Sequence, residues 1–491
     1  MLIFFLIIPL LGSLCCLFLG NKFYHASRCF SLFTVILMLI FSTFCWYKYF
    51  YRYHTTLYIQ YWNNEVIIPW IPQLGINLHF AIDGLSLIMI FLTSILGLLA
   101  ILHSFSEDKK NENLFYLSLL LILFGTVGVL LSIDLFLFFC FWEIMLLPMY
   151  FLIIFWGHKK YTKQQRKYTA NQFLIYTQIS SILMLFSILL LSLNYYYQNN
   201  IWTFDYNIFI KNTIPLFLQY IIMVGFFIAF AVKMPIVPFH GWIVNCYSQS
   251  PIDSSLDLIG MLIKVAAYGL LRFNIHLFKN TLHHIYPIIV ILGIITIFYS
   301  SWMAFAEKNV KKIIAYSSIS HMGFLLITIY CDNYFSSIGS IMQIVFGSFT
   351  TAALFILLSQ LYRRIQTNNI SKMGGLYSQI KWIPGFFLFF LFANLNLPGT
   401  VNFIGEIMML TGVYIKSSFI GGLLVFSLLF AVIYSLNMLN KIFYGEKKIL
   451  VIGSKNMYYF EFFIILFFVL VTLFLGFYPK MIISMIQFAT L

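Results

Sequence analysis

Long apolar runs separated by short polar segments make up most of this chain of 491 residues. A helix needs about 20 consecutive apolar residues to cross a membrane, so each run of that length predicts one span. The pattern predicts fourteen spans, at roughly 1–19, 29–47, 83–105, 114–133, 135–156, 170–193, 215–239, 251–271, 285–305, 313–330, 337–361, 383–413, 419–440 and 458–478. We therefore expect an all-α polytopic membrane protein that forms a single membrane domain over residues 1–491.

Composition strengthens this prediction. Hydrophobic residues are 62% of the chain and charged residues only 9%, whereas a soluble domain carries about 25% charged residues. This residue supply cannot cover a protein with a water-soluble surface. The longest connection, residues 51–81, is rich in Trp and Tyr, which is typical of a segment at the membrane interface.

The net charge of +14 would suggest nucleic acid in a soluble protein. Most of the 29 Lys and Arg residues, however, fall in loops that follow odd-numbered spans. Such an asymmetry is expected of a multi-pass protein whose basic loops stay inside, with both termini outside. We therefore expect lipids and no nucleic acid as partners.

Four ionisable residues lie deep within predicted spans, and they are Glu143, Lys233, Lys264 and Glu406. Left unpaired at the bilayer centre, the four charges together would cost about 10–14 kcal/mol on insertion scales. They must therefore face protein or water. Buried ion pairs that only hold helices together are weak stabilising devices, so a path for protons is the better interpretation.

Proline interrupts the helices that carry these charges. Two prolines follow Lys233 in FAVKMPIVPFHGW (230–242), and a Pro-Gly pair precedes Glu406 in LPGTVNFIGE (397–406). Pro148 lies close to Glu143. Broken helices are tolerated at membrane depth where they line a wet cavity.

The two interrupted helices predict a transporter fold with inverted five-helix repeats and two discontinuous helices. The second comes five spans after the first, and an offset of an odd number of spans reverses orientation. Repeat one covers about 114–271 and repeat two about 285–440, with the remaining helices peripheral.

Two further polar residues are candidates for a proton relay. Asp257 precedes Lys264 by seven residues, which places both on one helix face. His321 stands among serines in AYSSISHMGF (315–324), and a histidine with nearby hydroxyl groups suits proton transfer.

Cysteine and histidine patterns argue against bound redox groups. The seven cysteines never occur at C-x-x-C spacing, which argues against an iron–sulfur site. No two spans carry matched histidine pairs, as a haem-bearing electron carrier would need. We expect no iron–sulfur cluster, no haem and no other metal in this chain. A pure scaffold is a further alternative, which the cost of four deep charges disfavours.

Five blocks together resemble a known family. They are FWEIMLLPMYFLIIFWG (141–157), FAVKMPIVPFHGW (230–242), GMLIKVAAYGLLRF (260–273), KKIIAYSSISHMGF (311–324) and LPGTVNFIGE (397–406). They are similar to the antiporter-like chain 4 of proton-pumping NADH–quinone (ubiquinone) oxidoreductase, respiratory complex I. The acidic Glu406 distinguishes chain 4 from its sister chains 2 and 5, which would have a lysine there.

The resemblance implies a role for each deep residue. Glu143 and Lys233 match the family's carboxylate–lysine pair, and Lys264 matches its connecting lysine. His321 matches the linking histidine, and Glu406 the exit-side carboxylate. The chain would move protons while electron transfer takes place in other subunits.

The resemblance also implies partners and a location. Flavin, iron–sulfur clusters and quinone belong to partner subunits, and the chain would contact other membrane-arm subunits, including sister antiporter-like chains. The chain is rich in residues typical of an AT-rich genome, including 56 Phe and 32 Tyr. The resemblance and this residue usage together predict an organelle-encoded protein of the mitochondrial inner membrane. A bacterial plasma membrane is the alternative.

The sequence departs from the family at several relay positions. Gly347 stands where the family has a histidine in the eleventh span, and Asn245, Tyr247 and Gln249 replace ionisable residues. Asp257, or water, would have to substitute for the lost relay groups. A stand-alone cation/proton antiporter subunit shares the fold and the charges, and it stays open as the alternative function.

Overall fold

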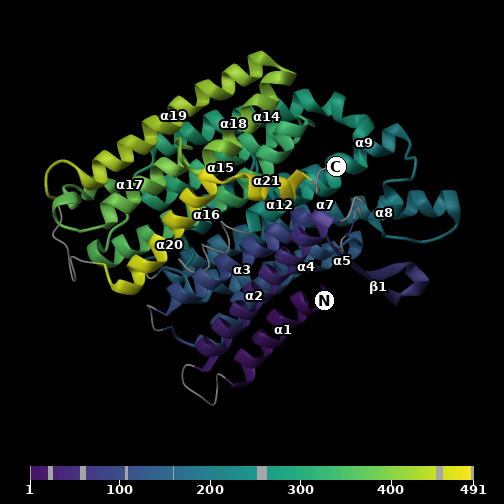
Figure 1. The fold of residues 1–491 in the computed structure, drawn as a ribbon, viewed down its shortest axis with the longest axis horizontal. Helices are drawn as coiled ribbons and strands as arrows, with labels where there is room; N and C mark the ends of the chain where they lie inside the picture. Colours follow the sequence, from purple (N-terminus) through teal and green to yellow (C-terminus); the bar gives the residue numbers. More distant parts are fainter. Residues whose placement is uncertain are drawn as a thin grey trace.

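The computed structural model describes residues 2–19, 26–55, 62, 64–105, 109–158, 160–251, 262–448 and 457–487. These residues form a bundle of long helices with one β-hairpin at its margin, and the N-terminal helices lie on one side of the bundle (Figure 1). The helices of the first half are α1 (Leu2–Leu19), α2 (Ala26–Thr55), α3 (Gly84–Ser104), α4 (Glu112–Leu131), α5 (Leu135–Ile144), α6 (Leu146–Trp156), α7 (Lys163–Asn199), α8 (Tyr206–Phe209), α9 (Leu216–Lys233) and α10 (Gly241–Gln249).

The second half continues the bundle and ends in a short helix. Its helices are α12 (Ile263–Gly269), α13 (Ile275–Leu277), α14 (Leu282–Ala306), α15 (Val310–Ile329), α16 (Tyr334–Ile365), α17 (Ile383–Asn394), α18 (Val401–Lys416), α19 (Ser418–Phe443), α20 (Tyr459–Phe477) and α21 (Lys480–Gln487). A π-helical turn, Leu270–Asn274, joins α12 to α13. Short 3-10 turns are Pro72–Leu74, Lys279–Thr281, Ile370–Lys372 and Leu376–Ser378.

The predicted spans agree with these helices. Eleven stretches in the described part of the chain are long and apolar enough to cross a membrane. The shorter helices α1, α17 and α18 lie in two of the three remaining predicted windows. Helix α12 lies in the third, 251–271, of which the structure describes residue 251 and residues 262–271. The all-α polytopic fold is confirmed.

Helix α16 lies at the centre of the bundle. Its most apolar window of 18 residues is completely buried, whereas the corresponding windows of α2 and α20 are 28% buried. It packs against α15, α17, α18 and α20, and also against α3 and α12. A helix that its neighbours enclose on all sides is a core element of the bundle.

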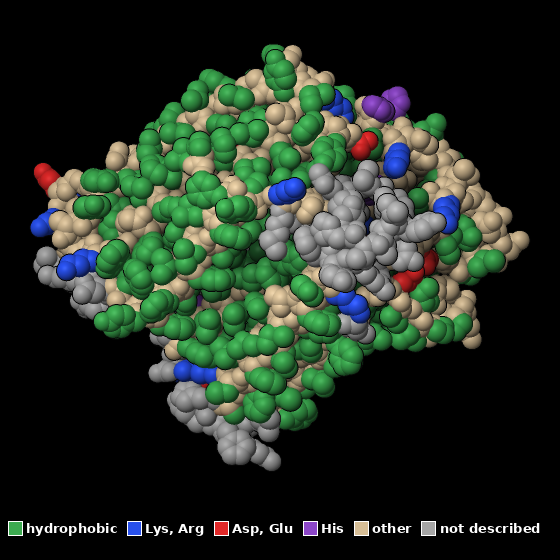
Figure 2. All heavy atoms as spheres, in the orientation of Figure 1, with side chains coloured by type: hydrophobic (Ala, Val, Ile, Leu, Met, Phe, Trp, Pro, Cys, Tyr) green, Lys and Arg blue, Asp and Glu red, His purple; other side chains and the backbone are tan. Residues whose placement is uncertain are grey.

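The outer surface is apolar. Hydrophobic side chains cover most of the face in Figure 2, and the visible Lys and Arg side chains lie mostly toward its margins. Large exposed hydrophobic side chains among the described residues include Phe217, Trp302 and Phe419. A surface of this kind is stable against lipid tails and not against water.

A β-hairpin forms within the connection that the sequence predicts only as an interfacial segment. Strands β1 (Asn64–Ile71) and β2 (Ile76–Ile82) pair antiparallel through the turn at Gly75. The hairpin projects from one end of the bundle beside α8 (Figure 1). Asp134, the N-cap of α5, accepts a hydrogen bond from the backbone N–H of Asn77 at 3.2 Å.

His79 ties the hairpin to α8. Its Nδ1 lies 2.7 Å from Oδ2 of Asp205, and its Nε2 lies 2.6 Å from Oε1 of Glu65. Burial lowers the pKa of His79, but hydrogen bonds and attraction from the two carboxylates outweigh burial and hold the pKa above its ordinary value. A raised pKa adds stability that is complete below the unfolded-state pKa and is lost as pH rises through the folded-state pKa.

We therefore expect the hairpin to loosen at alkaline pH. Protection of the amides of Ile76–Ile82 against hydrogen exchange, corrected for the intrinsic effect of pH, should fall as the pH rises above about 6.5 and through the raised pKa of His79. His79→Gln should flatten this profile, and His283→Gln, at an exposed site at the start of α14, should leave it unchanged. An unchanged profile in His79→Gln would contradict the assignment.

Candidate functional site

The first predicted break lies between α9 and α10. Helix α9 ends at Lys233, and α10 begins at Gly241 after the two prolines. The indole N–H of Trp242 donates to the carbonyl of Val232 at 3.0 Å, and the N–H of Val237 donates to Oγ1 of Thr296 at 3.1 Å. Side chains therefore satisfy backbone groups that the interruption frees, as burial at membrane depth requires.

The second break lies between α17 and α18 and uses the same device. Asn396 and Gly399 adopt left-handed backbone conformations, with φ of 56° and 93°. The Asn402 amide donates to the carbonyl of Ala393 at 3.0 Å and to Oγ1 of Thr350 at 3.1 Å. The prediction of two discontinuous helices is confirmed.

Lys233 is buried at the first break, with 2% of its surface exposed. Its Nζ lies 3.4 Å from the centroid of the Trp142 ring, a cation–π contact. Oε2 of Glu143, the next residue, accepts a hydrogen bond from Gln178 at 3.0 Å. Among the described residues no direct ion pair joins Glu143 to Lys233, so attraction between the two charges acts through space.

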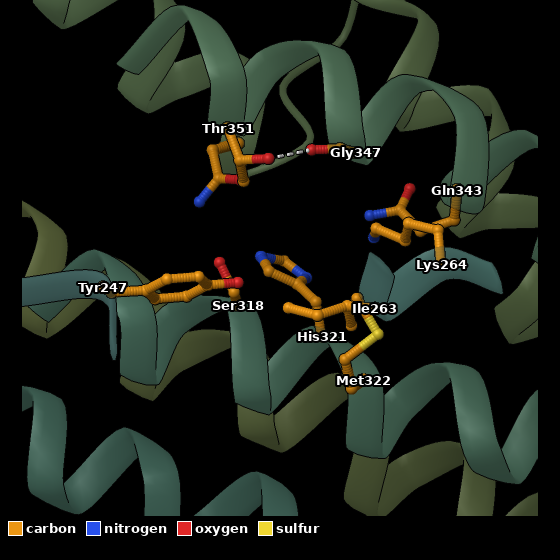
Figure 3. A pocket seen from close by; sticks show the side chains of 10 residues that line it. Tyr247, Ile263, Lys264, Ser318, His321, Met322, Gln343, Gly347 and Thr351 are labelled. Carbon is orange, nitrogen blue, oxygen red and sulfur yellow. Dashed lines mark hydrogen bonds between the residues drawn. The ribbon is translucent and has the colours of Figure 1, made fainter. Parts of the chain in front are cut away.

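Lys264 and His321 line one cavity, shown in Figure 3. The cavity is small, with a volume of about 10 Å³ for the centre of a water molecule, and it lies between α10, α12, α15, α16 and the end of α17. Its polar walls also include Tyr247, Ser318 and Gln343. The two predicted relay residues are therefore neighbours in space, although 57 positions separate them in the sequence.

Glu406 lies apart from this cavity. It is buried on α18, and the side chain of Asn396, from the break before that helix, hydrogen-bonds its carboxylate. Neither Glu406 nor Lys233 lines the cavity around Lys264. The structure thus places the deep charges at three separate positions within the bundle.

The other relay candidates have mixed outcomes. Asp257 lies outside the described residues, so its relation to Lys264 stays a prediction. Tyr247 reaches the cavity, whereas the Asn245 amide donates to Oε1 of Gln172 at 3.3 Å. Gly347 lies on the cavity wall, where it leaves space beside Lys264.

Sequence reasoning missed three residues that hold the charged groups, namely Trp142, Gln178 and Gln343. Trp142 directly precedes Glu143, but an aromatic residue in an apolar span carries no mark of a cation–π role. Gln343 is a polar residue in the interior of a fully buried helix, and that position was the one signal that could have identified it.

The arrangement suits proton transfer between buried side chains. It combines amines, carboxylates, an imidazole and amides, each of which exchanges protons or orients water. In the described part of the chain, no group of three His, Cys, Asp or Glu residues is placed to hold a metal ion.

Comparisons with known proteins identify relatives over nearly the whole chain. The family described as "NADH:quinone oxidoreductase/Mrp antiporter, TM" matches residues 132–433. NADH-quinone oxidoreductase subunit M of Escherichia coli K12 is 44% identical over 477 residues, covering 97% of this chain and 94% of the relative. Subunit M of Buchnera aphidicola from Schizaphis graminum is 51% identical over 386 residues, which cover 79% of this chain and 77% of the relative. Chain 4 of Marchantia polymorpha NADH-ubiquinone oxidoreductase is 31% identical over 476 residues, covering 97% and 93%.

Solved structures share the fold. A chain of respiratory complex I from Thermus thermophilus superposes with a TM-score of 0.86 at 22% identity, covering 100% of this chain and 99% of that one. A chain of the Mrp complex from Dietzia sp. DQ12-45-1b superposes with a TM-score of 0.82 at 17% identity, covering 99% and 96%.

The hydrogen bonds across the second break generate a stability prediction. Asn402→Leu leaves the Ala393 carbonyl and the Thr350 hydroxyl without this donor, and we expect a loss of about 1–3 kcal/mol. The measurement is the temperature at which the chain leaves its detergent-solubilised assembly. Asn199→Leu, at an exposed position of α7, is the control, and an equal shift in both variants would contradict the role of Asn402.

Proposed function

The chain belongs to the NADH:quinone oxidoreductase/Mrp antiporter family of membrane proteins, and we propose that this membership defines what it does. It is an antiporter-like, proton-translocating membrane-arm subunit of NADH:ubiquinone oxidoreductase. The enzyme that it belongs to couples electron transfer to proton movement. Its relatives with the names subunit M and chain 4 cover nearly all of its length.

The observation that carries this proposal is a contrast between two kinds of buried charge. Arg272 pairs with Asp83, and Nη2 of Arg364 lies 2.8 Å from Oε2 of Glu461. Such pairs hold their protons fixed, because neutralising one partner would leave the other charge buried alone. In the described residues the deep charges on α5, α9, α12 and α18 have no such partners, which supports a change of charge during function.

The first exchange would take place around Lys233. Trp142 favours the cationic form of the amine without a formal charge, and the nearby Glu143 carboxylate adds attraction. Neutralising Glu143, or moving it away, weakens the hold of Lys233 on its proton. The proton would then pass to Lys264 and His321 and leave through Glu406. The groups titrate together, so no single step belongs to one residue.

Cofactors and partners follow from this assignment as proposals. We expect flavin, iron–sulfur clusters and quinone in partner subunits and none in this chain. Other membrane-arm subunits, including sister antiporter-like chains, would contact its apolar surface alongside lipids. Repeats at about 114–271 and 285–440 would supply one broken helix each.

The chain is a multi-pass membrane protein. The mitochondrial inner membrane expected from residue usage is not confirmed, and relatives at 44% and 51% identity are bacterial. These relatives support a bacterial plasma membrane as the location.

A stand-alone cation/proton antiporter subunit is the alternative function. The Mrp chain with a TM-score of 0.82 has the same fold. At 17% identity this likeness supports the fold alone, whereas the relatives at higher identity carry the name of the oxidoreductase.

Removing a deep charge should impair proton pumping. We expect Glu143→Ala and Lys233→Ala to slow proton transfer at least about tenfold, because a rise in the barrier of only about 1.4 kcal/mol has this effect. The measurement is NADH-driven acidification of vesicles that contain the whole complex. Lys447→Ala, at an exposed loop position, is the control, and equal coupling in all three variants would contradict the pathway.

Isolation of the native particle separates the two functions. We expect the chain to copurify with NADH-reducible flavin and iron–sulfur signals after gentle solubilisation. Purification without redox centres, together with cation-dependent proton exchange in vesicles, would support the antiporter instead.

A further inference from the structure

Gln343 projects from α16 into the cavity around Lys264. Only 3% of its surface is exposed, and its Oε1 is buried with no hydrogen-bond partner among the described residues. Figure 3 shows the Gln343 amide and Lys264 side by side, with His321 across the cavity. An acceptor atom left unbonded at this depth is energetically unfavourable.

Gly347, one helical turn after Gln343, leaves space at this point. A Cβ placed on Gly347 would lie 3.6 Å from Nε2 of Gln343 and 3.6 Å from Nζ of Lys264. The amide and the ammonium therefore border the same region from two sides. Any side chain larger than alanine would extend toward these two groups.

The other polar groups of the cavity have different roles. Oγ1 of Thr351 donates to the carbonyl of Gly347 at 2.7 Å, and Oγ of Ser318 donates to the carbonyl of Ile314 at 3.0 Å. These two hydroxyls already use their hydrogens within their own helices. Among the described residues, two buried polar groups of the cavity have no hydrogen-bond partner, namely Oε1 of Gln343 and the hydroxyl of Tyr247.

These partners suit an ordered water. A buried water makes about two to four hydrogen bonds to polar groups that lack partners. An ammonium group has three donors and no acceptor, and the Nε2 of a carboxamide is also a donor. A water between them would accept from Nζ of Lys264 and from Nε2 of Gln343, the amide atom that borders this space, and it would have a hydrogen free for His321.

We propose that Gln343 is a positioning residue, whose carboxamide holds water in the space beside Gly347 and thereby joins Lys264 to His321. This inference rests on the proton-translocating function proposed above. In the transfer, an N–H bond of Lys264 breaks as its proton moves to the water oxygen, and an O–H bond of that water breaks as another proton moves to a ring nitrogen of His321. The water is regenerated, and no electrons are transferred.

The test compares variants of the intact complex in vesicles. Gln343→Leu removes both amide atoms at nearly constant size, and we expect fewer protons pumped per NADH oxidised. Gln343→Asn keeps a carboxamide and should recover part of the loss. Gln360→Leu is the matched control, because Gln360 is also buried on α16, its Oε1 has no hydrogen-bond partner among the described residues, and it does not line the cavity. It should pump normally.

A second pair of variants changes the space beside the amide. Gly347→Val and Gly347→Thr add side chains of nearly equal shape, one apolar and one polar. Valine should displace the water and lower the number of protons per NADH more than threonine does. This pair tests the role of the water if the Gln343→Leu complex fails to assemble. Independently, a structure of the complex that resolves water should contain a water within hydrogen-bond distance of Gln343.

Lys264→Ala separates failure of this inference from failure of the proposed function. If Lys264→Ala pumps normally, the pathway itself is wrong. If Lys264→Ala is impaired while Gln343→Leu pumps normally, or while Gly347→Val and Gly347→Thr behave alike, the positioning role of Gln343 is wrong.

Discussion

The low polarity of the membrane interior is the constraint on which the rest of this structure depends. A charge there needs a partner or water, and in the described residues the contacts recorded for the deep charges are with neutral groups. Lys233 contacts the ring of Trp142, Glu143 accepts from Gln178, and Glu406 is bonded by an asparagine. Full ion pairs lie elsewhere, as between Arg364 and Glu461. Rigid ion pairs and groups able to change charge thus occupy different parts of one bundle.

The same constraint explains why the broken helices are stable. An interruption frees backbone groups that lipid cannot satisfy. In both halves a side chain from the start of the second helix donates to a carbonyl near the end of the first, from Trp242 to Val232 and from Asn402 to Ala393. The two residues differ in type and share no motif, yet they occupy corresponding places. This likeness supports a common plan for the two halves that their sequences preserve only weakly.

Much of the fold could be predicted because the signal is strong where spans are long. Runs of apolar residues located the helices, and the prolines around residues 235 and 398 located the breaks. The hairpin was missed because β1, with Pro69 within NEVIIPWI, lacks clear alternation of polar and apolar positions. Trp142 and Gln343 were missed because their roles depend on which helices meet, and spacing along one helix does not contain that information. Asp257 stays untested because it lies outside the described residues.

The contact between Lys233 and Trp142 has a chemical consequence. An indole ring attracts a cation through its π face but has no lone pair that could accept the proton. An aspartate in the same place would hold the ammonium and also compete for its proton. The ring performs only the first of these tasks, so the acceptor must be another group that comes within reach of Lys233. The contact that holds the amine in place therefore cannot itself accept the proton that the amine carries.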